Sequence, residues 1–110
     1  TNYQAIKEGM RGVTSDGSGT AYSYFKDFDI EVGGKTGSAT TDTNHNADAW
    51  FVGFAPFDDP EIAVAVYVKN GQHGNYTAPT AREIFEQYLG MNAGTVTEDM
   101  TATSYMQTVR

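Results

Sequence analysis

Four consecutive residues, Lys35-Thr36-Gly37-Ser38, combine the side-chain types best suited to bind an anion. They lie within residues 31–39, a stretch that holds one lysine, two hydroxyl side chains and three glycines. An ammonium and hydroxyls donate hydrogen bonds to an anion, and glycines let a ligand approach the backbone closely. The pattern therefore predicts an anion-binding segment.

A nucleotide-binding P-loop is one alternative, because Gly34-Lys35-Thr36 matches the end of that motif. The first glycine that the motif requires would fall at Asp29. In addition, the residues after Lys35 are typical of loop and strand, whereas a P-loop lysine stands at the start of a helix. We therefore reject a nucleotide site.

A second alternative is Ser23-Tyr24-Phe25-Lys26, which has the Ser-x-x-Lys spacing of serine acyltransferases and β-lactamases. In that motif, one helical turn brings the lysine amine beside the serine hydroxyl. Here apolar and polar residues alternate over residues 22–30, which predicts extended chain with residues three apart on opposite faces. We interpret the Ser23 match as accidental.

Lys35-Thr36-Gly37-Ser38 also has a purely structural interpretation. A glycine-containing edge strand with an exposed lysine is a common device against aggregation between sheets. Because Lys-Thr-Gly often occurs by chance, the tetrad alone favours this interpretation over a binding site. The rest of the chain must decide between the two.

Other candidate sites are weaker. His45 and His73 are each expected in a loop without a partner at metal-ligand spacing, and the chain has no cysteine. The adjacent acids Asp58-Asp59 precede Pro60, which is typical of a turn and not of an acid–base pair. No metal and no cofactor is therefore predicted.

Composition narrows the function further. The 110 residues suffice for one domain, and fourteen acidic against seven basic side chains give a net charge of -7. This charge repels polyanions, so no nucleic-acid partner is expected. No apolar run approaches the roughly 20 residues that a membrane-spanning helix requires.

Three strands and two helices are predicted from periodicity. A helix over residues 1–13 is indicated by a Thr1–Gln4 capping box and by one apolar face. The members of that face are Tyr3, Ile6, Met10 and Val13. One strand is expected to begin in the lysine-containing stretch, and a second covers residues 48–57, with Phe51 and Trp50 on opposite faces.

The third strand, residues 62–68, is an unbroken apolar run of the kind covered on both faces, and its small residues Ala63 and Ala65 would let a helix approach closely. A Thr80–Glu83 capping box predicts a second helix ending at Leu89-Gly90. Its expected buried face comprises Ala81, Ile84, Phe85 and Tyr88. Short connections favour antiparallel pairing, so the predicted class is α+β, with helices packed on an antiparallel sheet. Residues 1–90 form this unit and residues 91–110 a polar tail.

Four segments in this order resemble the C-terminal part of a penicillin-binding protein transpeptidase domain, and the class B enzymes look nearest. The segments are Gly-Lys-Thr-Gly-Ser-Ala at 34–39, Ala-Trp-Phe-Val-Gly-Phe-Ala-Pro at 49–56, Ile-Ala-Val-Ala-Val at 62–66 and Ala-Pro-Thr-Ala-Arg-Glu-Ile at 78–84. Four ordered motifs are far more specific than one. The resemblance covers roughly residues 3–89 and implies the fold of the serine β-lactamase and penicillin-binding superfamily.

The family uses a Ser-x-x-Lys nucleophile, a Ser-x-Asn loop and a Lys-Thr-Gly strand, in that chain order. Only the third is expected here, because no Ser-x-Asn occurs in the chain and Ser23 lies too close to Lys35. The resemblance therefore implies that the nucleophile lies on polypeptide outside this chain. The partner would be the rest of the transpeptidase domain, which carries those two motifs.

The resemblance assigns a role to each residue of the tetrad. Lys35 would attract the terminal carboxylate of a D-Ala-D-Ala stem peptide or of a β-lactam and support proton transfer. The Thr36 and Ser38 hydroxyls would bind that carboxylate, the backbone N–H of Ser38 would complete the oxyanion hole, and Gly37 would leave room for substrate along the strand. The family often has threonine where this chain has Ser38.

The implied activity is peptidoglycan D,D-transpeptidation by a serine acyl-enzyme, at the extracytoplasmic face of a bacterial cell membrane. The expected ligands are peptidoglycan stem peptides and β-lactam antibiotics. Three alternatives remain open within the superfamily: a D,D-carboxypeptidase, a β-lactamase and a β-lactam-binding sensor.

Overall fold

A computed structural model describes residues 1–40 and 43–91 of the chain. Along the sequence its elements are α1 (Asn2–Ser15), α2 (Tyr22–Phe25), β1 (Gly33–Ala39), β2 (Asp48–Ala55), β3 (Ile62–Val68), the 3-10 helix η1 (Gly74–Thr77) and α3 (Ala78–Tyr88). Apart from residue 91, the predicted tail lies outside the described residues.

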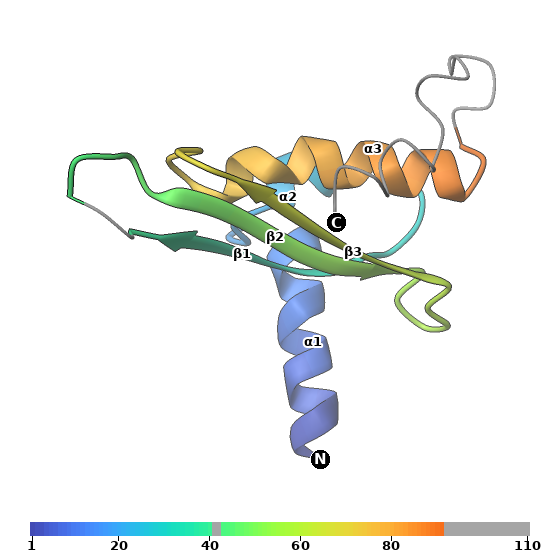
Figure 1. Cartoon of the computed structure of the whole chain (residues 1–110). Coiled ribbons are helices and arrows are strands. Elements are labelled where there is room, and N and C mark those ends of the chain that lie inside the picture. Colours follow the sequence, from blue (N-terminus) through green and yellow to red (C-terminus); the bar gives the residue numbers. More distant parts are fainter. Residues whose placement is uncertain (41–42, 92–110) are drawn as a thin grey trace.

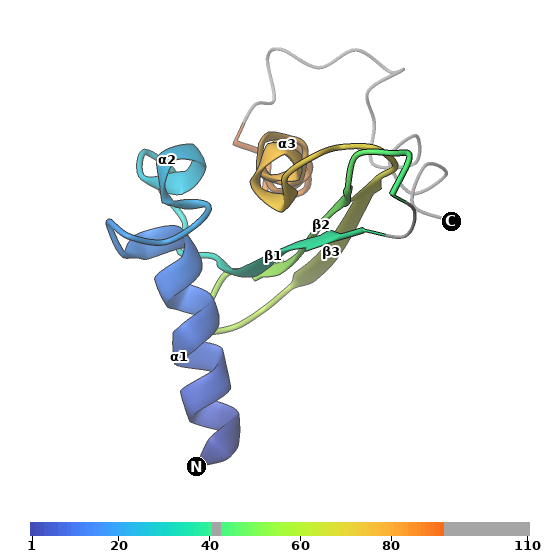
Figure 2. The ribbon, with the colours of Figure 1, turned by 90° about the vertical axis from the view of Figure 1, so that its left-hand side faces the viewer.

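The three strands form an antiparallel sheet in the order β1-β2-β3, which confirms the predicted α+β class. Lys35 pairs with Val52 and Gly37 with Trp50, while Val52 pairs on its other side with Ala65. Helix α3 runs across one face of this sheet, and α2 lies beside α3 (Figures 1 and 2). Within the described residues, β1 is therefore an edge strand.

The core lies between the sheet and α3 and is centred on Phe51, which is fully buried. Its ring stacks on Phe25 of α2 at 5.9 Å between centroids, and Phe25 in turn contacts Phe85 of α3 at 6.4 Å. As the alternation in residues 48–57 predicts, Trp50 on the opposite face is 42% exposed. One aromatic cluster thus joins the sheet to both of these helices.

The extended chain predicted for residues 22–30 is wrong, because Tyr22–Phe25 forms one turn of helix. The backbone N–H of Lys26 donates to the carbonyl of Tyr22 at 2.8 Å. Phe25 does not fit the alternating pattern that predicted a strand. Its ring is buried against Phe51, and a helical turn brings it there. Tertiary packing therefore overrides a short period-two pattern.

Helix α1 and its Thr1–Gln4 capping box are confirmed, but the helix is not buried along the whole predicted face. Tyr3 and Ile6 are 74% and 66% exposed, and the N-terminal half projects away from the sheet (Figures 1 and 2). Only its last turns reach the core, where the Thr14 hydroxyl donates to the carbonyl of Val32 at 2.6 Å. A 14-residue helix that crosses the sheet near one end leaves the other end uncovered.

The predictions for β3 and α3 hold in part. Helix α3 covers the Val64 and Val66 face of β3, whereas Ala63 and Ala65 are exposed, so the strand is not covered on both faces and the helix does not approach its small side. The length of α3 also differs from the prediction, and Tyr88 is 51% exposed.

The predicted Thr80–Glu83 capping box does not form, since α3 begins at Ala78, three residues before the start that a Thr80 cap predicts, and continues directly from η1. Pro79 fits this start, because a proline in the first turn removes an N–H that has no helical partner. The predicted end at Leu89-Gly90 is confirmed by the left-handed backbone of Gly90, with φ of 75°.

Asp48 fastens the start of β2 to the end of β3. Its carboxylate accepts the backbone N–H of Asn70 at 3.0 Å and the Tyr67 hydroxyl at 2.8 Å. These two hydrogen bonds, the backbone one first, hold the pKa of Asp48 below its ordinary value. The charged form is therefore the one that stabilises the fold.

Replacing this carboxylate, as in Asp48→Asn, should lower the melting temperature at pH 7. The stabilisation by Asp48 is fully present above the ordinary carboxylate pKa of about 4 and is lost as pH falls through the lower folded-state pKa. The difference between the two proteins should therefore shrink below pH 4. Thermal unfolding followed by circular dichroism between pH 3 and 7 measures this, with Asp58→Asn at an exposed turn as the control. A difference that is constant with pH would contradict the prediction.

Candidate active site

Strand β1 divides the predicted tetrad between its two faces. Thr36 and Ser38 lie on the face that η1 and α3 cover, whereas the side chain of Lys35 belongs to the opposite face, since residues alternate along a strand. Thr36 is buried, at 9% exposure. The structure therefore places the two hydroxyls, but not the ammonium, together.

A pocket of about 340 Å³ opens over these two hydroxyls. Its wall comes from three segments that are distant in sequence: the turn before α2, strand β1, and the chain entering η1. The lining residues are Thr20, Thr36, Ser38, His73, Gly74, Asn75 and Tyr76. Such a wall of hydroxyl, amide and imidazole groups suits a small polar ligand.

Both hydroxyls of β1 are hydrogen-bonded from the segments around them. The backbone N–H of Gly74 donates to Ser38 Oγ at 2.8 Å. Thr20 Oγ1 and Thr36 Oγ1 are also 2.8 Å apart, and either oxygen can be the donor. These contacts fix the hydroxyl oxygens at the pocket wall.

The backbone of η1 meets the backbone of β1 without an intervening side chain. A Cβ atom on Gly74 would lie 2.6 Å from the amide nitrogen of Gly37, well inside van der Waals contact. Gly74 is itself buried. Its lack of a side chain therefore permits the approach that brings its N–H to Ser38.

Lys35 is exposed, and its Nζ donates to the carbonyl oxygen of Thr36 at 2.5 Å. It does not line the pocket over Thr36 and Ser38. An ammonium has three donors, so this bond leaves two for other acceptors. The contact also holds the lysine against the strand that carries the two hydroxyls.

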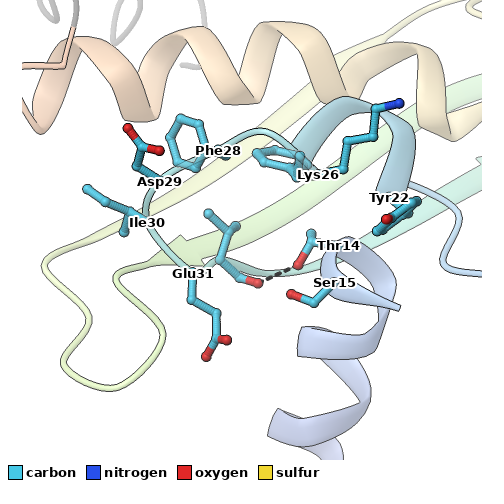
Figure 3. A pocket seen from close by; sticks show the side chains of 10 residues that line it. Thr14, Ser15, Tyr22, Lys26, Phe28, Asp29, Ile30 and Glu31 are labelled. Atoms are coloured by element: carbon cyan, nitrogen blue, oxygen red, sulfur yellow. Dashed lines mark hydrogen bonds between the residues drawn. The ribbon is translucent and has the colours of Figure 1, made fainter. Parts of the chain in front are cut away.

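The geometric reason for rejecting Ser23 is wrong, although no site forms there. Ser23 and Lys26 lie on one helical turn, not on opposite faces of a strand. Both side chains are exposed, however. Lys26 instead lines a separate pocket of about 380 Å³ at the start of β1, where Asp29 and Glu31 are also found (Figure 3).

Sequence reasoning missed most of the pocket wall opposite β1. The sequence patterns assign no site to Thr20 or Gly74, and they place His73 in a loop without a metal-ligand partner. His73 is exposed as expected, but its ring packs edge-on against Tyr76 at 5.3 Å, and both line the pocket. The cluster of glycines around residues 71–74 was the one available signal, because glycine often marks a close backbone approach.

Two structural features are absent from residues 1–40 and 43–91. No group of three or more histidine and acidic side chains is arranged to hold a metal ion there. None of the helices in these residues has the length and hydrophobicity needed to cross a bilayer.

Comparison with known families gives one match that covers most of the chain. Residues 1–90 match the family model described as the penicillin binding protein transpeptidase domain. Among curated proteins, the peptidoglycan D,D-transpeptidase MrdA of Haemophilus influenzae is 31% identical over 102 aligned residues, covering 79% of this chain and 16% of that protein. The chain thus spans about one-sixth of the length of this relative.

Solved structures give the same result. Pseudomonas aeruginosa PBP2 in complex with WCK 5153 superposes with a TM-score of 0.76 at 33% identity, over 89% of this chain and 21% of that one. The penicillin G acyl-enzyme complex of penicillin-binding protein A from M. tuberculosis has a TM-score of 0.61 at 28% identity, over 78% of this chain and 20% of that one.

The close approach at Gly74 gives a prediction for stability. Gly74→Ala should lower the free energy of unfolding by about 1–3 kcal/mol, because the added Cβ forces η1 away from Gly37. Urea denaturation measures the change. Gly9→Ala is the matched control, because Gly9 is an exposed residue in the middle of α1 and nothing lies within 4 Å of the added Cβ. That control should raise the free energy of unfolding by about 0.5–1 kcal/mol. Equal effects of the two substitutions would refute the packing role.

Proposed function

The chain belongs to the penicillin-binding protein transpeptidase domain family, and on that premise we propose that it is part of a peptidoglycan D,D-transpeptidase. The observation that carries the proposal is the pairing of the Thr36 and Ser38 hydroxyls in one pocket on an edge strand. Their ligand would be the terminal carboxylate of a D-Ala-D-Ala stem peptide or of a β-lactam. Charge-assisted hydrogen bonds of this kind are about twice as strong as neutral ones.

Lys35 would act from beside the pocket and not from within it. Its ammonium supplies positive potential and, with two donors left, supports proton transfer near the serine of the Ser-x-Asn loop. The backbone N–H of Ser38 would be the second donor to the oxyanion, the first being the N–H of the nucleophile. Gly37 would allow the substrate to lie along the outer edge of β1 as an added strand.

The reaction would be acyl transfer through a serine ester. The serine oxygen attacks the carbonyl of the penultimate D-Ala, the peptide C–N bond breaks, and the terminal D-Ala leaves with a proton on its amine. An amine of a neighbouring stem peptide then attacks the ester and restores the serine hydroxyl. In this proposal the chain contributes the carboxylate-binding hydroxyls and one half of the oxyanion hole.

The nucleophile would come from polypeptide outside this chain, on the part of the transpeptidase domain that carries Ser-x-x-Lys and Ser-x-Asn. The complete enzyme would act at the extracytoplasmic face of a bacterial cell membrane. Its anchor would also lie outside the chain.

The names of the relatives favour transpeptidation over the other activities of the superfamily. The curated H. influenzae relative is a peptidoglycan D,D-transpeptidase, and the M. tuberculosis structure is an acyl-enzyme with penicillin G. The lifetime of the penicillin adduct separates a β-lactamase from a transpeptidase or a sensor experimentally. A transpeptidase or sensor should hold the adduct for long times, whereas a β-lactamase should release it within its catalytic cycle.

Ser38→Ala in the intact protein should lower the second-order rate of acylation by labelled penicillin about 10–100-fold. The substitution removes one hydrogen bond to a charged carboxylate but keeps the backbone N–H of the oxyanion hole. Ser38→Thr, which keeps the hydroxyl, is the control and should retain most of the rate. No covalent adduct on the wild-type intact protein would sink the proposed function.

The 110-residue chain alone should form no covalent penicillin adduct, because its only Ser-x-x-Lys match, Ser23 with Lys26, lines no pocket with Thr36 and Ser38. Intact-mass spectrometry after incubation with benzylpenicillin measures this. A stable adduct on Ser23 would show that the role of that turn has been misjudged.

A further inference from the structure

Thr20 contacts the carboxylate-binding pair without belonging to the tetrad. Its hydroxyl oxygen lies 2.8 Å from that of Thr36 and lines the same pocket. We propose that Thr20 is a positioning residue that holds the Thr36 hydroxyl as a hydrogen-bond donor toward a bound carboxylate. This inference rests on the proposed function, because the carboxylate is the ligand assigned there.

The backbone holds Thr20 in place on both sides. The N–H of Gly19 donates to the carbonyl of Asp16 at 2.8 Å, and the N–H of Ala21 donates to the carbonyl of Val13 at 3.0 Å. A Cβ on Gly19 would lie 2.7 Å from the carbonyl carbon of Val13, and Ala21 is fully buried. Residues 19–21 are therefore packed and hydrogen-bonded against the end of α1, which fixes the position of Thr20 relative to β1.

The number of protons then sets the direction of the bond. A hydroxyl has one donor and two acceptor sites, and an ionised carboxylate can only accept. When Thr36 donates to the carboxylate, its bond with Thr20 must run from Thr20 to Thr36. Thr20 thus donates to Thr36, and Thr36 donates to the ligand, an arrangement in which each hydrogen bond strengthens the next.

Ser38 provides an internal parallel. The group behind it is the backbone N–H of Gly74, which can only donate, so the Ser38 hydroxyl keeps its proton for the pocket. Thr20 does for Thr36 what this amide does for Ser38. Both hydroxyls of β1 then face the ligand as donors, which favours a carboxylate over a neutral amide or ester because hydrogen bonds to an ionised acceptor are stronger.

The test uses the intact protein and compares Thr20→Val with Thr20→Ser. With benzylpenicillin, Thr20→Val should lower the acylation rate constant about three- to tenfold, and Thr20→Ser should restore it. With the uncharged methyl ester of benzylpenicillin, Thr20→Val should lower the rate less, because the ester carbonyl accepts a weaker hydrogen bond than an ionised carboxylate. In a protein that already carries Thr36→Val, Thr20→Val should lower the acylation rate no further, because the Thr36 hydroxyl through which Thr20 acts is absent.

Three controls make the outcomes distinct. Thr80→Val, at an exposed threonine of α3, should change neither rate, and the melting temperature of Thr20→Val should match that of the wild type. An equal loss with the acid and the ester, or a loss that adds to that of Thr36→Val, would overturn the inference in favour of a structural role. An unchanged rate with benzylpenicillin would also overturn it. Absence of any adduct on the wild type would instead reject the proposed function itself.

Discussion

The buried ring of Phe51 is the constraint on which the rest of the structure depends. It leaves no space for a side chain at Gly34 of β1 or Gly53 of its own strand, where a Cβ would lie 2.6 and 2.7 Å from ring atoms. The same ring stacks on Phe25, which explains why α2 turns inward. Gly34, next to the lysine, is therefore required for packing.

The packing around Phe51 also fixes the position of the β1 backbone at the pocket. Because β1 pairs with β2 along its whole length, the backbone of Gly37 is fixed beside η1, and the absence of a side chain on Gly74 lets the two segments touch. Glycine costs more conformational entropy on folding than any other residue. Here that cost is offset because the backbone N–H of Gly74, already fixed by η1, donates a hydrogen bond to Ser38. A side-chain donor would have to be ordered separately.

The sequence predicted what depends on local pattern and missed what depends on distant packing. The strands over residues 48–55 and 62–68 and the α1 capping box follow from residue spacings of two and three. The helical turn at Phe25 and the exposure of Tyr3 do not, because they depend on where α1 and α2 meet the sheet. Thr20 and Gly74 reach the pocket across 16 and 36 residues of chain, so no local spacing could identify them.

A chain with a net charge of -7 can still recognise an anion, because the attraction needed is short-ranged. At physiological ionic strength the Debye length is about 8 Å. Repulsion between a bound anion and acidic side chains farther away than this is largely screened. Within that distance, directed donors decide the outcome, and in the proposed site they would be two hydroxyls backed by Thr20 and by the amide of Gly74. Such a site would distinguish a single carboxylate from a polyanion: the carboxylate would need only these few donors, whereas the polyanion would bring many charges close to an acidic surface.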